Sequence, residues 1–187
     1  MLPGGDRNHK FRVDHQHQIK LLRAQIVMYP DYPQKGVLFR DMSPLLEDAE
    51  MLSMLMEVWS QRFMDWKVDV VVGIESRGLA LACGLALKLK AGYLAMRKQH
   101  KLPGAVYRAS YQKEYGPDVL ELSQSHLLAG KKTLIVDDLI ATGGTFQAAV
   151  QLVEEARGEV VCVTSVLDVA ELDFTQEISV PSFVLLK

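Results

Sequence analysis

The chain has 187 residues, of which 49% are hydrophobic and 24% are charged, and its formal net charge is −2. These values are typical of a globular protein with one substantial core, and the length leaves little room for a second. The small net charge argues against a general nucleic-acid-binding protein, which needs many cations to neutralise phosphates.

The first 17 residues are polar and lack the apolar core of a secretory signal peptide. The longest apolar stretch, residues 78–87, is too short to cross a bilayer. Cys83 and Cys162 each lie alone in an apolar run, so we expect reduced core residues. These features predict no membrane partner and a cytoplasmic location.

The N-terminal region begins without periodicity, and residues 1–16 are expected to form a loose arm. His15 and His17 form a His-x-His pair, but no further ligands follow at suitable spacing, so a polar arm is favoured over a metal site. Apolar residues then recur at helical spacing over residues 19–28, which predicts a short amphipathic helix.

Two prolines and a glycine interrupt residues 29–41, and this segment is expected to be irregular. A confident helical pattern follows over residues 47–63, because its large apolar side chains share one face. Asp48 is suited to cap the start of that helix.

From residue 68 onward, short β-branched runs alternate with helical stretches. Strands that are apolar on both faces and alternate with helices indicate a parallel sheet covered on both sides. We therefore predict an α/β fold and a single domain over residues 1–187. The predicted strands cover residues 68–73, 93–96, 132–136 and 160–166, and the predicted helices cover residues 79–90 and 144–156.

A long polar segment, residues 97–127, separates the second and third predicted strands. Part of it could form a hairpin. A segment of this length in a compact domain is usually functional or mobile, so we expect a flexible loop that serves the site.

The strongest functional signal is TLIVDDLIATGGT, residues 133–145. A β-branched run ends in Asp137 and Asp138, and a turn with two glycines leads into the next helix. Such turns and helix amino ends direct backbone N–H groups at anions, and Thr142 and Thr145 add hydroxyl donors. The carboxylates suit the hydroxyl groups of a sugar. The pattern therefore predicts a site for a ribose phosphate.

A simpler interpretation of the same residues is structural. Asp138 or Thr142 would then cap the helix, and the glycines would only form the turn. The other common phosphate motifs, GxxxxGK[ST] and GxGxxG, are absent from the sequence.

The stretch VDDLIATGGT resembles the phosphoribosyl-pyrophosphate loop of the type I phosphoribosyltransferases and, within that family, the adenine phosphoribosyltransferases. Further segments resemble motifs of the same family, in the same order. Residues 30–41 resemble its purine-side hood, residues 73–78 its pyrophosphate turn, and residues 97–104 and 110–116 its flexible catalytic loop.

The resemblance implies a Rossmann-like parallel sheet with a small N-terminal hood, over residues 29–41, and a flexible catalytic loop. It also implies a reaction in which adenine displaces pyrophosphate from phosphoribosyl pyrophosphate to give AMP. Mg²⁺ would be required, held mainly through substrate and water and not by protein ligands. A homodimer is implied, because in the family a loop cation reaches the neighbouring subunit's site.

The resemblance further implies roles for individual residues. Glu114 would exchange a proton with the purine, beside Tyr111 and Tyr115 of the loop, and Arg77 would assist departure of the pyrophosphate. The other expected ligands are Ser76, Arg97, Lys98 and Lys101 for pyrophosphate, Asp137, Asp138, Ala141, Thr142, Gly143, Gly144 and Thr145 for ribose and phosphate, and Val37, Leu38, Phe39, Arg40 and Leu139 for adenine.

Alternatives stay open from the residues alone. The loop cations could form a solvated basic face, Glu114 could be a surface glutamate, and Phe39 could be a core residue. The base could also be hypoxanthine, guanine or xanthine. A regulator that binds phosphoribosyl pyrophosphate without turnover is a further alternative, although the segment before Tyr29 is too short for a DNA-binding module.

Overall fold

The computed structural model of the chain describes residues 7–113, 116–124, 126–169 and 178–187. The chain divides into two compact units, and the single domain stays a prediction. The first extends to Trp59 and includes Leu186, and the second comprises Ser60–Leu185 together with Lys187.

The first unit begins with a helix that starts earlier than predicted. α1 spans Arg7–Ala24, so residues 7–16 are helical and the expectation of a loose arm is wrong for them. This part of the sequence has only two apolar residues, Phe11 and Val13, so it offers no apolar stripe for periodicity to detect. The predicted helix over residues 19–28 is correct only up to Ala24.

A two-stranded hairpin follows where an irregular segment was expected. β1 (Val27–Pro30) pairs antiparallel with β2 (Leu38–Asp41). The β-branched and aromatic side chains that begin at Val27 favour extended pairing over continuation of the helix.

Two helices follow, α2 (Ser43–Glu47) and α3 (Ala49–Gln61). α3 confirms the helix predicted over residues 47–63, whereas the short α2 was not predicted. Asp48 lies between them, and its Oδ1 accepts hydrogen bonds from the backbone N–H groups of Glu50 and Met51, both at 2.9 Å. The predicted cap is therefore confirmed, because these amides are among those that a helix start leaves without partners.

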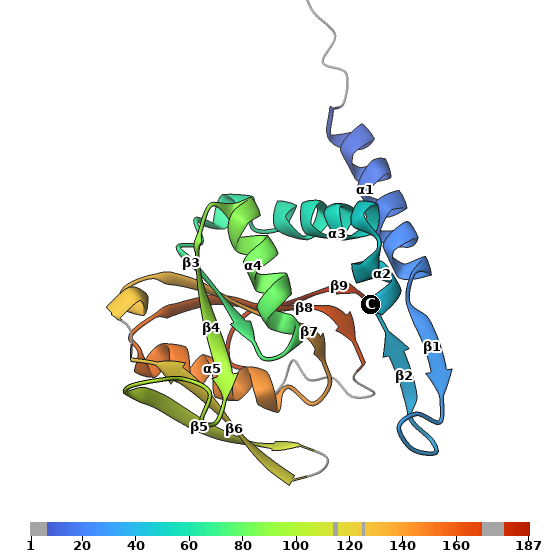
Figure 1. The fold of residues 1–187 in the computed structure, drawn as a ribbon. Coiled ribbons are helices and arrows are strands. Elements are labelled where there is room, and N and C mark those ends of the chain that lie inside the picture. Colours follow the sequence, from blue (N-terminus) through green and yellow to red (C-terminus); the bar gives the residue numbers. More distant parts are fainter. Residues whose placement is uncertain (1–6, 114–115, 125, 170–177) are drawn as a thin grey trace, which may run out of the picture. The chain divides into compact units, whose positions relative to one another are not determined.

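The second unit contains a seven-stranded sheet with the order β5-β6-β4-β3-β7-β8-β9 (Figure 1). β4, β3, β7 and β8 are parallel, whereas β5 and β6 are antiparallel. The predicted α/β fold with a parallel sheet is thus confirmed for the central strands, and the antiparallel strands β5 and β6 extend it. Its strands are β3 (Val70–Ile74), β4 (Gly92–Lys98), β5 (Val106–Lys113), β6 (Gly116–Ser123), β7 (Lys132–Ile140), β8 (Glu159–Asp168) and β9 (Ser182–Leu186), with 3-10 turns at Met64–Trp66 and His126–Leu128.

Two helices cover opposite faces of this sheet. α4 (Arg77–Leu89) connects β3 to β4, and α5 (Gly144–Glu155) connects β7 to β8. β4 and β8 lie on opposite sides of the β3–β7 pair, so right-handed crossovers place the two helices on opposite faces, as Figure 1 shows. The order of the strands therefore reverses between β3 and β7. In open α/β sheets, ligands bind at the carboxyl ends of the strands on either side of such a reversal.

β3 is buried along its whole length, and its side chains alternate between the two helices. Val70, Val72 and Ile74 belong to the core cluster that contains Phe146 of α5. Gly73 faces α4, because a Cβ built on it would lie 2.7 Å from the Cβ of Ala82.

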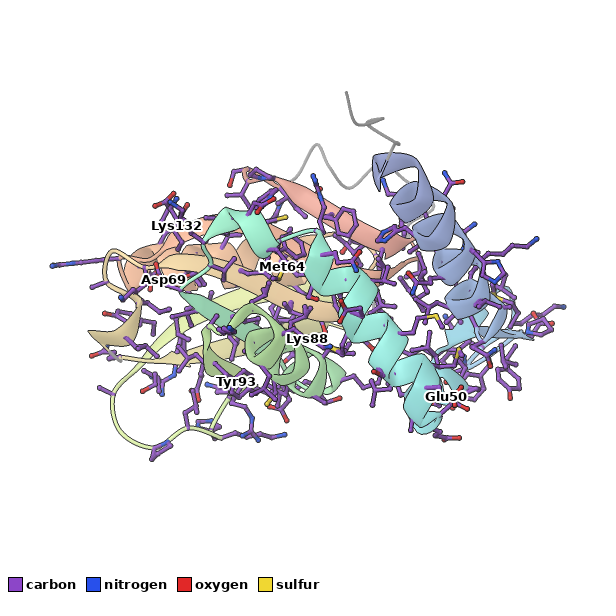
Figure 2. All side chains as sticks on the ribbon, turned by 90° about the horizontal axis from the view of Figure 1, so that it is seen from above. Glu50, Met64, Asp69, Lys88, Tyr93 and Lys132 are labelled. Atoms are coloured by element: carbon purple, nitrogen blue, oxygen red, sulfur yellow. The ribbon has the colours of Figure 1, made fainter. Side chains whose placement is uncertain are left out.

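The amino ends of the central strands are joined by Asp69 (Figure 2). Its backbone N–H donates to the carbonyl of Lys132 at 2.8 Å, and its Oδ2 accepts from the Lys132 N–H at 2.9 Å. Its carbonyl accepts from the Gly92 N–H at 2.9 Å. These bonds hold β3, β7 and β4 in register at their amino ends.

The segment predicted as a flexible loop, residues 97–127, is built largely as a β-hairpin. β5 and β6 pair along their full length, and β6 continues the sheet by pairing with the end of β4, where Glu121 lies opposite Arg97. The alternation of polar with apolar residues in β5 was too weak to distinguish this hairpin from a loop.

The prediction that both cysteines are core residues is correct for Cys162 and wrong for Cys83. Cys162 is buried in β8, and burial raises the pKa of its thiol to about 12. Cys83 is exposed, because the buried face of α4 is formed by Leu81, Ala82 and Leu85. Within the described part of the chain, no helix combines the length and apolar character needed to cross a membrane.

We predict that Gly73→Ala lowers the free energy of unfolding by about 2 kcal/mol, because the new methyl group would lie 2.7 Å from Ala82 Cβ and from the Gly78 carbonyl oxygen. Gly92→Ala on the adjacent strand is the control, since its Cβ would meet Asp69 O at an ordinary 3.5 Å. Urea unfolding measures both variants. Equal losses would contradict the close approach of α4 to β3.

Candidate active site

The end of β7 presents two neighbouring carboxylates. Leu134 to Val136 are buried, whereas Asp137, Asp138 and Leu139 are partly exposed. Asp137 Oδ1 accepts the N–H of Asp138 at 2.8 Å, and Asp138 Oδ1 accepts the N–H of Leu139 at 3.0 Å. Each carboxylate is thus fixed by the backbone of the residue that follows it.

Arg77 lies directly across from this pair, on the turn after β3. Its Nε is 2.6 Å from Asp138 Oδ2, and the Asp138 side chain is 13% exposed. The contact requires close approach of α4 to β7, which Gly78 permits. A Cβ at Gly78 would lie 2.9 Å from both Asp137 Oδ1 and the Val136 carbonyl oxygen.

The two aspartates differ in electrostatic environment. Burial of the Asp137 carboxyl group, followed by repulsion from the Asp138 charge, raises the pKa of Asp137 well above its ordinary value. Arg77 opposes this rise but is bound to Asp138. Asp137 therefore holds a proton more readily than an exposed aspartate does.

The turn after β7 leads directly into α5. Gly143 has φ +85°, a left-handed conformation that favours glycine, and its carbonyl accepts the N–H of Gln147 at 3.0 Å. Among the described residues, none accepts a hydrogen bond from the backbone N–H groups of residues 141–145. These amides, at the positive end of a 12-residue helix, form a suitable anion site. Thr142 is exposed and Thr145 is partly buried.

A second group of charges gathers on Glu75, which follows β3. Its Oε2 accepts Nε of Arg97 at 3.1 Å and the Lys98 N–H at 2.9 Å, and its Oε1 accepts Nζ of Lys101 at 2.5 Å. Burial alone would raise the pKa of Glu75, but these hydrogen bonds outweigh it and lower the pKa to about 2. The carboxylate is therefore ionised at neutral pH.

The structure thus brings together only part of the predicted pyrophosphate set. Arg97 and Lys101 meet on Glu75, whereas the Lys98 ammonium group lies 3.8 Å from Asp118 on β6. Successive residues of a strand point to opposite faces, which explains why Lys98 leaves the cluster that Arg97 joins. Ser76 is exposed at the turn before Arg77.

Among the predicted loop residues, Tyr111 is buried on β5, and its hydroxyl group donates to Asp118 Oδ2 at 3.3 Å. Glu114 and Tyr115 lie outside the described residues. The structure therefore does not test the predicted proton-transfer role of Glu114.

The residues predicted to contact adenine fall into both units. Leu139 lies on β7 of the second unit. In the first unit, Val37 accepts the N–H of Tyr32 through its carbonyl at 3.2 Å, and Phe39 packs edge-on against Tyr32 with ring centroids 5.2 Å apart. Leu38 is exposed and Arg40 is partly buried. Their role in base binding stays a prediction.

Sequence reasoning missed the organising role of Glu75, which it treated only as part of a motif. A weak signal existed, because an acidic residue follows a buried strand and a basic stretch follows the next strand. Only the parallel register, which pairs Ile74 with Met96, places Glu75 beside Arg97. Among the described side chains, no three His, Cys, Asp or Glu residues form a set that could hold a metal ion.

Comparisons with known proteins point to one family. Residues 43–179 match the model of a family described as phosphoribosyl transferase domain. A protein of Nitrosopumilus maritimus named adenine phosphoribosyltransferase is 40% identical over 158 residues, which cover 84% of this chain and 93% of that protein. A protein of Debaryomyces hansenii with the same name is 38% identical over 167 residues, which cover 89% and 90%.

Solved structures agree with these relatives. Adenine phosphoribosyltransferase of Saccharomyces cerevisiae, complexed with adenine and an imino-altritol bisphosphate, superposes with a TM-score of 0.84 at 35% identity, covering 91% of this chain and 99% of that one. The Giardia lamblia enzyme with 9-deazaadenine gives a TM-score of 0.83 at 30% identity, covering 89% and 96%.

We predict that Asp137→Asn raises the free energy of unfolding at pH 7 by about 1 kcal/mol, because a neutral amide removes the buried charge next to Asp138 and its oxygen can still accept the Asp138 N–H. The pKa of Asp137 is raised on folding. The wild type therefore loses stability relative to the variant as the pH rises above the ordinary value of 3.8.

Urea unfolding between pH 3 and pH 8 measures this difference. Asp138→Asn is the matched control, since it removes the partner of Arg77 and should give no gain. A destabilised Asp137→Asn variant at neutral pH would show that the Asp137 charge is stabilising.

Proposed function

The chain belongs to the phosphoribosyl transferase domain family and, within it, to the adenine phosphoribosyltransferases, and we propose that it transfers the phosphoribosyl group of phosphoribosyl pyrophosphate to adenine. The products are AMP and pyrophosphate, which makes the chain a purine salvage enzyme. Relatives between 38% and 43% identical bear the adenine name, so transfer to six-oxo purines is not favoured.

The observation that carries this proposal is the junction of β7 and α5. Backbone amides with no acceptor among the described residues lie directly after two carboxylates, Asp137 and Asp138. In the proposal, residues 141–145 bind the 5-phosphate of the sugar through their amides and the threonine hydroxyl groups. The aspartates accept hydrogen bonds from the ribose hydroxyl groups and stabilise positive charge that develops on the sugar.

The leaving group needs positive charge close to it. Arg77, Arg97 and Lys101 are the cations proposed for pyrophosphate, with Lys98 and the Ser76 hydroxyl group as further donors. Support comes from their placement, because Arg77 begins α4 after β3 and Arg97 is the second-last residue of the neighbouring strand β4. These cations would stabilise the charge that accumulates on pyrophosphate as its bond to the sugar breaks.

In the base-binding part of the proposal, backbone groups of Val37, Leu38 and Arg40 read the edge of adenine. Phe39 and Leu139 flank its ring. A purine nitrogen bonds to the anomeric carbon as pyrophosphate leaves with the electrons of the broken bond. The proton of the imidazole ring passes to Glu114, a step worth roughly a hundred- to ten-thousand-fold in rate.

Magnesium completes the proposal as a metal carried by the substrate. Mg²⁺ is usually bound by one or two carboxylates together with phosphates and water. Asp137 and Asp138 at the end of β7 fit this mode, because they offer carboxylates beside the substrate, which together with water would supply most of the metal's ligands. The metal would neutralise pyrophosphate charge.

We further propose that the enzyme is a homodimer and cytoplasmic. The homodimer rests on the resemblance of the loop cations to those that reach a neighbouring subunit in the family. Both cysteines are free, which suits a reducing compartment.

An assay with phosphoribosyl pyrophosphate and Mg²⁺ tests the function directly. Adenine, hypoxanthine, guanine and xanthine are compared as acceptors, and formation of the nucleotide is measured by chromatography. We expect AMP from adenine and turnover at least a hundredfold lower with the other bases, whose hydrogen-bonding groups would leave partners unpaired. Exclusive use of a six-oxo purine would overturn the assignment.

We predict that Glu114→Gln lowers kcat by roughly a hundredfold with a smaller change in KM, because it removes proton transfer and leaves ground-state contacts largely intact. Glu154→Gln on the exposed face of α5 is the control with the same change of charge and should keep wild-type kinetics. Steady-state kinetics with adenine measure both. An unchanged kcat in Glu114→Gln would remove the role of this residue.

A further inference from the structure

Each of the cations assigned to pyrophosphate faces a carboxylate of the protein. Arg77 pairs with Asp138 at 2.6 Å, and Lys98 lies 3.8 Å from Asp118. Arg97 and Lys101 share Glu75. A pyrophosphate that uses these cations must therefore compete with anions that belong to the protein.

Glu75 is the carboxylate that Arg97 and Lys101 share. Its side chain is 9% exposed and accepts from Arg97, from the Lys98 amide and from Lys101. Its own N–H donates to the Met96 carbonyl at 3.0 Å. The turn after β3 is thus tied to the end of β4 through one residue.

The charges in this cluster do not cancel. One carboxylate faces the two cationic side chains of Arg97 and Lys101, so the cluster has a net charge of +1 where the cations alone would give +2. Both cations are accessible, with side chains 33% and 48% exposed. A carboxylate and a phosphate oxygen offer guanidinium and ammonium groups the same kind of charged acceptor, so one can replace the other.

Glu121 shows what a purely structural carboxylate in the same region does. It is 1% exposed and accepts from the His100 N–H at 3.0 Å and from Arg108 Nε at 2.8 Å. It anchors the same stretch of chain, residues 97–101, from β6. Its side-chain partner is not one of the cations assigned to pyrophosphate.

We propose that Glu75 is a positioning residue for pyrophosphate, an internal counter-anion that holds Arg97 and Lys101 at the end of β4 and is displaced from them when pyrophosphate binds. This inference rests on the proposed function, which supplies the pyrophosphate. Glu75 thereby lowers the affinity for pyrophosphate and helps this product to leave, a step that limits many enzymes.

The test is the affinity for inorganic pyrophosphate, measured by calorimetry with Mg²⁺ at fixed ionic strength. Glu75→Gln keeps an acceptor for the Lys98 amide but removes the competing charge, so we expect about tenfold tighter binding. Glu75→Asp keeps the charge and should stay within about threefold of the wild type. Glu121→Gln changes the net charge of the protein equally and should also stay within about threefold.

Steady-state kinetics separate this role from support of the fold. Tighter retention of pyrophosphate should lower the inhibition constant of pyrophosphate in Glu75→Gln by the same tenfold, whereas loss of structure would raise it. Equal or weaker binding by Glu75→Gln, or equal tightening by Glu121→Gln, would overturn the inference.

A measurement on the wild type does not depend on whether Glu75→Gln folds. In protein labelled with ¹³C at the glutamate carboxyl groups, the Glu75 signal, identified by its loss in Glu75→Asp, should shift when pyrophosphate saturates the protein. A signal that does not move would also overturn the inference. If the wild type makes AMP but the Glu75 signal does not move, or Glu75→Gln does not bind pyrophosphate more tightly, only the inference fails. If the wild type neither binds pyrophosphate nor makes AMP, the proposed function fails with it.

Discussion

The close approach of the β3–α4 turn to the end of β7 is the constraint on which the rest of the site depends. Two right-handed crossovers lead from β3 and β7 toward opposite sides of the sheet and leave these two strands adjacent, with their carboxyl ends side by side. Gly73 and Gly78 then allow α4 to lie against both strands, closer than any side chain would permit. The 2.6 Å contact between Arg77 and Asp138 is the result.

This packing gives similar carboxylates opposite properties. Asp137 lies under the first turn of α4 beside another aspartate, and its pKa is raised. Glu75 lies at the end of the neighbouring strand but receives two cations and an amide, and its pKa falls to about 2. The residue types alone would suggest the same ionisation for both side chains. Their different ionisation arises from the donors that the strand register places around each of them.

Much of this arrangement could be predicted from the sequence, because local patterns determine it. The β-branched run of β7, its terminal aspartates and the glycines before α5 predicted a strand, a turn and a helix in the places where they occur. The role of Glu75 could not be predicted in this way, because its partners lie 22 to 26 residues further along the chain. The exposure of Cys83 was missed for a related reason, since an apolar helix does not reveal which face packs on a sheet.

The two proposed anion sites differ in a way that matches what happens to each anion in the reaction. The 5-phosphate is present in both substrate and product, and the site proposed for it consists of backbone amides with no competing acceptor among the described residues. Pyrophosphate is attached at the start and must leave at the end, and the cations proposed for it are paired with carboxylates. Amides fixed by the backbone bind a phosphate equally well before and after transfer, so they anchor the sugar without favouring either state. Cations that can return to a protein carboxylate bind the leaving group more weakly, and they are therefore suited to an anion that must be released in every cycle.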